Sequence, residues 1–97
     1  MIGRHVNFNV IPGKEKEFET LFKESYSVAM SRQPGFVSVA LLKEHEKEAV
    51  YQMLIRFQTL ETAAAWRDSE DHKALSPRIK SLYSNSTVQV YEVIAQK

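Results

Sequence analysis

The chain has 97 residues, of which 43% are hydrophobic and 26% are charged, a composition that fits one globular domain over residues 1–97 and excludes a disordered chain. Thirteen basic and 12 acidic residues give a net charge of +1, which offers no net field to attract nucleic acid or an anionic membrane. The absence of cysteine excludes disulfides, thiolate metal sites and thiol chemistry.

The first half of the chain changes from a strand pattern to a helix pattern. Residues 2–11 alternate between two faces, which predicts a strand, and Pro12-Gly13 ends it. From Lys14 the apolar residues recur with a helical period, and the helix should stop near Arg32 because Pro34-Gly35 follows. Its predicted apolar stripe is Phe18, Leu21, Phe22, Ser25, Val28 and Ala29.

Two strands are predicted next, over 36–43 and 50–57, joined by the polar hairpin loop 44–48. Thr59 is a good N-cap for a helix from Leu60 to about Arg67.

The last quarter of the chain contains two further cap signals. Ser69 can begin a new helical turn, and Ser76-Pro77 is typical of a cap followed by proline at the first helical position. A short helix is therefore expected over 78–83, and the alternation over 87–94 predicts a final strand.

The order β-α-β-β-α-β predicts an α+β ferredoxin-like fold, in which an antiparallel sheet carries its helices on one face. The other face would be left bare. Either residue set of the 50–57 strand is apolar, so that face should need a cover, and a second copy of the chain is the simplest one. We therefore expect a homodimer.

Several segments resemble the antibiotic biosynthesis monooxygenase (ABM) domain family over about residues 2–94. They are Pro12-Gly13 before the first helix, Pro34-Gly35-Phe36 before the second strand, the segment from Trp66 to Lys73, and the closing Val90 to Ile94. The resemblance implies a dimeric α+β barrel, in which two ferredoxin-like sheets pack face to face. Some members are cofactor-free monooxygenases that turn polyphenols into quinones, others degrade haem, and others process small signalling molecules.

The haem-degrading relatives use an Asn, a Trp and an iron-binding His. Trp66 matches the Trp, but the Asn position falls on Val6, and Asn7 lies on the opposite strand face. The iron-binding His would fall near Ser76. Two of the three residues are therefore missing, which disfavours haem degradation.

The quinone-forming relatives use a Trp, an Asn one turn before it and a Tyr six residues after it. Here Trp66 matches the Trp, Thr62 stands for the Asn and His72 for the Tyr. His72 can act as an acid or a base near neutral pH. The resemblance thus implies Trp66 and His72 as catalytic residues and Thr62 as a substrate-binding one.

Other readings of the same residues stay open. Trp66 can be a core aromatic, and His72 can be a helix-start residue bonded to Ser69. Among Tyr26, Tyr51, Tyr83 and Tyr91, Tyr51 is the strongest candidate for substrate binding, because it lies on a central strand.

Two arginines interrupt apolar strands. Arg4 and Arg56 can each reach the sheet edge or hold an anionic substrate. Arg4 is the further substrate-binding candidate, and the pattern leaves both roles open.

The three histidines, His5, His45 and His72, have no zinc-ligand spacing, and no glycine-rich cofactor motif is present, so we expect no metal and no cofactor. No apolar run is long enough for a membrane span, and Met1 to His5 has no signal-peptide character, so a cytoplasmic protein is expected. Two functions remain: a cofactor-independent monooxygenase of a small phenolic or quinol-like compound, or a non-catalytic dimeric ligand-binding or stress-related domain.

Overall fold

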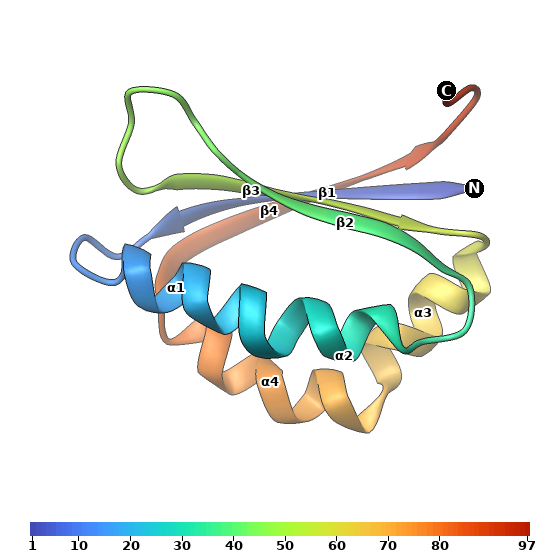
Figure 1. Ribbon diagram of the computed structural model, residues 1–97, viewed down its shortest axis with the longest axis horizontal. Helices are drawn as coiled ribbons and strands as arrows, with labels where there is room; N and C mark the ends of the chain where they lie inside the picture. Colours follow the sequence, from blue (N-terminus) through green and yellow to red (C-terminus); the bar gives the residue numbers. More distant parts are fainter.

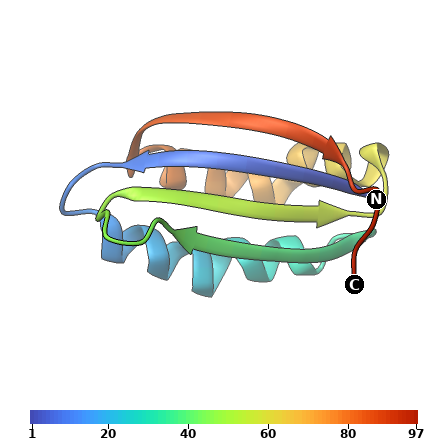
Figure 2. The same ribbon diagram turned by 90° about the horizontal axis from the view of Figure 1, so that it is seen from above.

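The computed structural model describes residues 1–97 and has the predicted α+β ferredoxin-like architecture. The strands are β1 (Ile2–Val10), β2 (Phe36–Lys43), β3 (Val50–Phe57) and β4 (Tyr83–Glu92). The helices are α1 (Glu15–Leu21), the π-helical turn η1 (Phe22–Tyr26), α2 (Ser27–Ser31), α3 (Leu60–Asp68) and α4 (Glu70–Lys80). The strands form one antiparallel sheet in the order β2-β3-β1-β4, and every helix lies under the same face (Figures 1 and 2).

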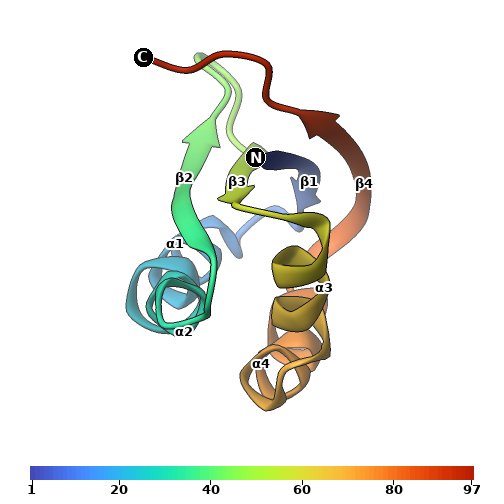
Figure 3. The ribbon, with the colours of Figure 1, turned by 90° about the vertical axis from the view of Figure 1, so that its right-hand side faces the viewer.

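The core lies between the sheet and two helical rows. Figure 3 shows α1 and α2 under the β2 side and α3 and α4 toward the β4 side. Strand alternation places Tyr51, Met53, Ile55 and Phe57 of β3 on the helix-facing side, all buried. Phe18 of α1 packs its ring against Phe8 and Tyr51, at centroid distances of 5.2 Å each. Burying each such side chain contributes about 1.5–3 kcal/mol, so this layer stabilises the contact between the helices and the sheet.

A π-helical turn interrupts the first helix, where the sequence predicts a regular one. The Ser27 N–H donates to the carbonyl of Phe22 five residues earlier, which winds one extra residue into the turn. The buried residues consequently follow a spacing of four, Phe22, Tyr26 and Met30, and Val28 of the predicted stripe is left 38% exposed. The turn therefore brings the Tyr26 side chain into the interior.

The open face of the sheet is more polar than the sequence argument assumed. The apolar set from Tyr51 to Phe57 is covered by helices, and only the alternate set of β3, including Val50 and Leu54, faces outward. Across β1, β3 and β4 this face has a ladder of polar side chains: Gln52 donates to Asn7 at 3.0 Å, and Asn7 donates to Thr87 at 3.4 Å. The open face is therefore not the continuous apolar surface from which the sequence argument predicted a dimer.

The last helix and strand differ from the prediction. Instead of a cap at Ser76 and a short helix over 78–83, α4 continues through Pro77 to Lys80, and β4 begins at Tyr83 rather than at 87. A proline inside a helix costs about 3 kcal/mol. Burial of Leu75 and Ile79, which lie one turn apart on the same face, holds the helix together across it.

Gly35 allows the close approach of the turn before β2 to the start of α3. Its φ is +79°, and an added Cβ would lie 2.5 Å from the Cβ of Thr62. Gly13 has a similar φ of +92° but nothing within 4 Å of an added Cβ.

Gly13→Ala should therefore cost only the backbone strain, about 1–2 kcal/mol. Gly35→Ala should cost clearly more, because α3 must also shift. Urea unfolding of the two variants measures the difference, and equal losses would contradict the steric argument.

Candidate functional site

A break between α3 and α4 brings Trp66 and His72 together. On one continuous helix the two residues would point about 240° apart. Ser69 is instead extended (φ −69°, ψ 154°) and connects the helices as a cap. Its hydroxyl donates to the Trp66 carbonyl at 2.6 Å and accepts from the His72 N–H at 3.1 Å. The chain therefore changes direction at Ser69, as its cap signal suggests.

Three aromatic rings from separate elements meet at this break. Trp66 and His72 are edge to face, with centroids 5.1 Å apart and planes at 88°. Tyr26, at the end of η1, lies 5.5 Å from Trp66 and 6.2 Å from His72. Trp66 is only 1% exposed, and its indole N–H is buried without a hydrogen-bond partner.

A cavity of about 190 Å³ lies between α4 and the β1-β4 side of the sheet, next to this cluster. His72 and Tyr26 line it. Trp66 packs against both of these rings but does not line the cavity. The remaining lining residues are Arg4, Val6, Phe8, Met53, Ile55, Arg67, Ser76, Ile79, Lys80, Tyr83, Ser86 and Val88. The site therefore combines an apolar floor with a few polar groups, as small-molecule sites do.

The cavity keeps His72 neutral. Burial lowers the pKa of the imidazole below its ordinary value, and the positive charges of Arg4, Arg67 and Lys80 lower it further. The carboxylate of Asp68 opposes them as the smallest of these influences. A neutral imidazole near pH 7 can accept a proton, which is the state a general base requires.

Tyr26 is held as a neutral phenol. Burial raises its pKa to about 12, and the charge of Arg4 acts in the opposite direction. The Trp66 indole lies near enough to favour the phenolate slightly, but the pair does not reach hydrogen-bonding geometry. Tyr26 can therefore donate a hydrogen bond to a molecule in the cavity at neutral pH.

The lowered pKa of His72 predicts a loss of stability in mild acid. As the pH falls below about 6.5, the unfolded chain binds a proton at this residue before the folded chain does, so the free energy of unfolding decreases. The contribution of His72 to stability is fully present above the pKa of the unfolded state and is lost as the pH falls through the pKa of the folded state. Urea melts between pH 7 and 5 should show a shallower slope in His72→Asn than in wild type. His45→Asn, in the exposed hairpin loop, is the control and should keep the wild-type slope.

Two other candidate residues lie outside the cavity. The Thr62 hydroxyl is engaged in a capping box with Thr59, accepting from its N–H and donating to its carbonyl, and its side chain packs on Gly35. The Tyr51 hydroxyl donates to Glu19 at 2.5 Å; burial first, and this bond next, raise its pKa. Neither side chain faces His72, so the geometry offers no support for a role of either in binding a substrate there.

The two candidate arginines, Arg4 and Arg56, lie on opposite faces of the sheet. Arg4 lies on the helix-facing side and lines the cavity. Arg56 lies on the open face and donates to Nε2 of His5 at 3.0 Å. The sequence reasoning missed Arg67 and Lys80 in this cavity. It named Tyr26 and Tyr83, which both line the cavity, but ranked Tyr51 above them.

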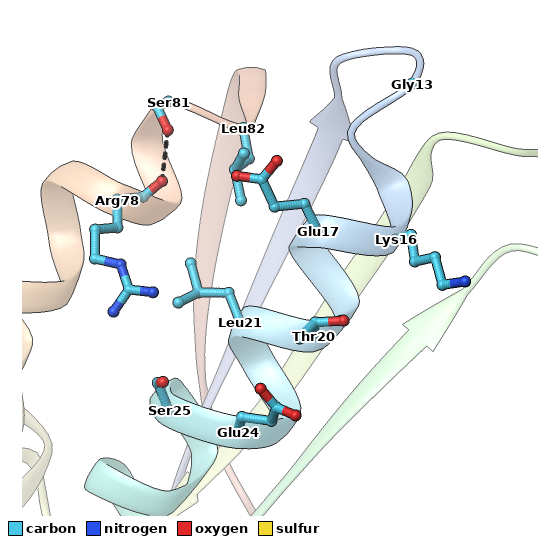
Figure 4. Close-up of a pocket in the computed structure, with 10 residues that line it drawn as sticks. All are labelled: Gly13, Lys16, Glu17, Thr20, Leu21, Glu24, Ser25, Arg78, Ser81 and Leu82. Carbon is cyan, nitrogen blue, oxygen red and sulfur yellow. Dashed lines mark hydrogen bonds between the residues drawn. The ribbon is translucent and has the colours of Figure 1, made fainter.

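A larger groove of about 610 Å³ runs between the first helical row and the end of α4, and contains none of these residues (Figure 4). Its walls include the charged residues Lys16, Glu17, Glu24 and Arg78, with only Leu21 and Leu82 as apolar members. It is open and mostly polar. The smaller cavity at His72 is therefore the stronger candidate site.

Two further structural features bear on the site's chemistry. No group of three or more His, Asp or Glu side chains is placed so that it could hold a metal ion. None of the helices has the length and apolar character needed to cross a membrane.

The family model for antibiotic biosynthesis monooxygenase matches residues 1–78. The chain belongs to this family. No curated protein sequence matches the chain significantly. The resemblance inferred from the two Pro-Gly turns and the Trp66 segment is thus confirmed, and the match runs from β1 almost to the end of α4, across the break at Ser69.

Solved structures agree with the ABM assignment. A variant of SnoaB from Streptomyces nogalater, described as a cofactor-independent oxygenase, has a TM-score of 0.88 at 21% identity, covering 98% of this chain and 94% of that one. A conserved protein from Methanosarcina mazei has a TM-score of 0.84 at 19% identity, covering 93% and 89% of the two chains. At such identities the likeness establishes the ABM fold, and the function has to be argued from the site.

Proposed function

We propose that this ABM protein is a cofactor-independent monooxygenase that acts on a small phenolic or quinol-like compound. The observation that carries the proposal is a neutral His72 lining a cavity beside the only tryptophan and a neutral phenol. Family membership and the likeness to SnoaB, described as a cofactor-independent oxygenase, support it.

In the proposed reaction, His72 takes the proton of a substrate hydroxyl and leaves an electron-rich anion. This anion gives electrons to dioxygen directly. One oxygen atom enters the substrate. The other oxygen atom takes two hydrogens from the substrate and leaves as water. The substrate thus supplies all four electrons, so the reaction is balanced without an added reductant.

The cavity also disfavours the haem-degrading alternative. Val6 and Ser76, at the positions where those relatives have Asn and His, both line it. A valine can neither donate nor accept a hydrogen bond, and a serine hydroxyl is a poor substitute for an imidazole as an iron ligand.

Oxygen uptake with a panel of quinols and anthrones tests the function. Wild type should consume oxygen faster than the spontaneous oxidation of each compound, with one atom of labelled dioxygen found in the product. If no compound is oxidised above the spontaneous rate, although ligands bind in the cavity, the non-catalytic binding domain is the correct reading.

We further propose that the protein is a homodimer, as in the ABM barrel. Val90 of β4 is 55% exposed, and Tyr91 and Ile94 leave further apolar surface uncovered at the same end of the chain. Light scattering at micromolar concentration should give about twice the 11.2 kDa chain mass. A folded monomer at that concentration would contradict the dimer.

A further inference from the structure

The cavity has a one-sided charge. Its basic members are Arg4, Arg67 and Lys80, and none of its lining residues is acidic. The protein as a whole is nearly balanced, with 13 basic and 12 acidic residues, so this excess is local. A pocket with three positive groups and no carboxylate raises the local concentration of anions.

Arg4 is a half-buried cation in this cavity that has no partner within the protein. It lies on the apolar helix-facing side of β1, opposite Ile55 and Val90, and is half-buried. It takes part in none of the salt bridges and none of the side-chain hydrogen bonds of the protein, although burial lowers its pKa. Arg56, by contrast, has both His5 and a backbone carbonyl as acceptors.

A guanidinium taken partly out of water without a counter-charge is costly. Such a group is stabilised when an anion enters beside it. The planar fork of an arginine fits a carboxylate with two parallel hydrogen bonds. The volume of about 190 Å³ is below the range of about 300–1,000 Å³ that holds drug-sized ligands, which favours a molecule of one or two rings.

We propose that the substrate of this cavity is a small phenol or quinol that also carries an ionised carboxylate, with Arg4 as the residue that selects it. This rests on the proposed function for the reacting hydroxyl, which faces His72. Arg67 and Lys80 are exposed at the rim and attract the anion, whereas Arg4, deeper in the cavity, binds it.

A matched pair of ligands tests the selection without any turnover. We would titrate 2,5-dihydroxybenzoate and its methyl ester into wild type by calorimetry under nitrogen, at low salt. The acid should bind about 10- to 100-fold more tightly than the ester, the usual effect of a hydrogen-bonded charge. Equal affinities of wild type for acid and ester would overturn the proposal, and this comparison needs no variant.

The variants then assign the effect to one residue. Arg4→Gln should bring acid and ester affinities to within about threefold, and Arg4→Lys should keep part of the preference. Arg78→Gln removes the same charge from the exposed side of α4, outside the cavity, and should behave as wild type. Retained affinity of Arg4→Gln for the ester shows that its pocket is intact. An undiminished preference for the acid in that variant would assign the selection elsewhere and overturn the role of Arg4.

Oxygen uptake distinguishes failure of this inference from failure of the proposed function. Arg4-dependent binding of the acid with no oxygen consumption would support carboxylate selection by Arg4 and contradict the proposed monooxygenase activity. Fast oxidation of neutral quinols, with no advantage for the acid and no effect of Arg4→Gln, would support the monooxygenase activity and contradict carboxylate selection by Arg4.

Discussion

His72→Ala should lower turnover about a hundredfold or more while the protein stays folded. The imidazole is the only side chain lining the cavity that can act as a base near neutral pH, so its loss leaves the substrate hydroxyl without one. Oxygen uptake at saturating quinol measures the effect. In wild type, kcat should also fall as the pH decreases and His72 takes up a proton, and this acid limb should disappear in the variant.

His45→Ala is the matched control for this prediction. His45 lies in the exposed loop between β2 and β3, away from the cavity, and its removal should leave kcat unchanged. Turnover of His72→Ala within a fewfold of wild type would show that the base is another group or that the reaction needs none.

Trp66→Ala should cost about 3–5 kcal/mol of folding free energy, a large part of the 5–15 kcal/mol typical of a domain. The indole is 1% exposed and lies edge to face against both Tyr26 and His72, so its removal leaves a cavity where α3, α4 and η1 meet. Urea unfolding measures the loss. Trp66→Phe keeps a ring in place and should cost less.

Leu60→Ala is the control on the same helix. Leu60 is 58% exposed, so its truncation should change stability by less than about 0.5 kcal/mol. Similar losses for the two alanine variants would mean that Trp66 is not part of the packed core that the structure shows.

Local signals predict most of the fold because they act within a few residues. Strand alternation groups Met53 and Ile55 on one face, although it does not decide which face the helices cover, and the cap at Ser69 predicts the break that joins Trp66 to His72. The start of β4 escapes prediction because Ser84, Asn85 and Ser86 have low strand propensity. Asn85 and Ser86 are recruited by pairing with Asn9 and Phe8 of β1, and Asn85 accepts a hydrogen bond from Asn9 at 2.5 Å.

The candidate site is harder to predict because it depends on contacts between distant elements. The sequence places Trp66, His72 and Arg4 among the candidates, but it favours Tyr51 over Tyr26. Tyr51 lies on a central strand, yet its hydroxyl is taken by Glu19 on the other side of the core. Tyr26 enters the cavity because the helix changes its winding just before it, and no composition or spacing rule announces that change.

That winding makes η1 the adjustable part of the cavity wall. One surplus residue stored in a helical turn corresponds to about 100° of rotation at the positions beside it. A chain with one residue fewer between Leu21 and Ser27 could close the turn as ordinary helix and still pack Phe18 and Met30 against the sheet. Tyr26 would be the side chain to leave. A single codon lost at this point can therefore replace one wall of the pocket and leave the rest of the scaffold in place.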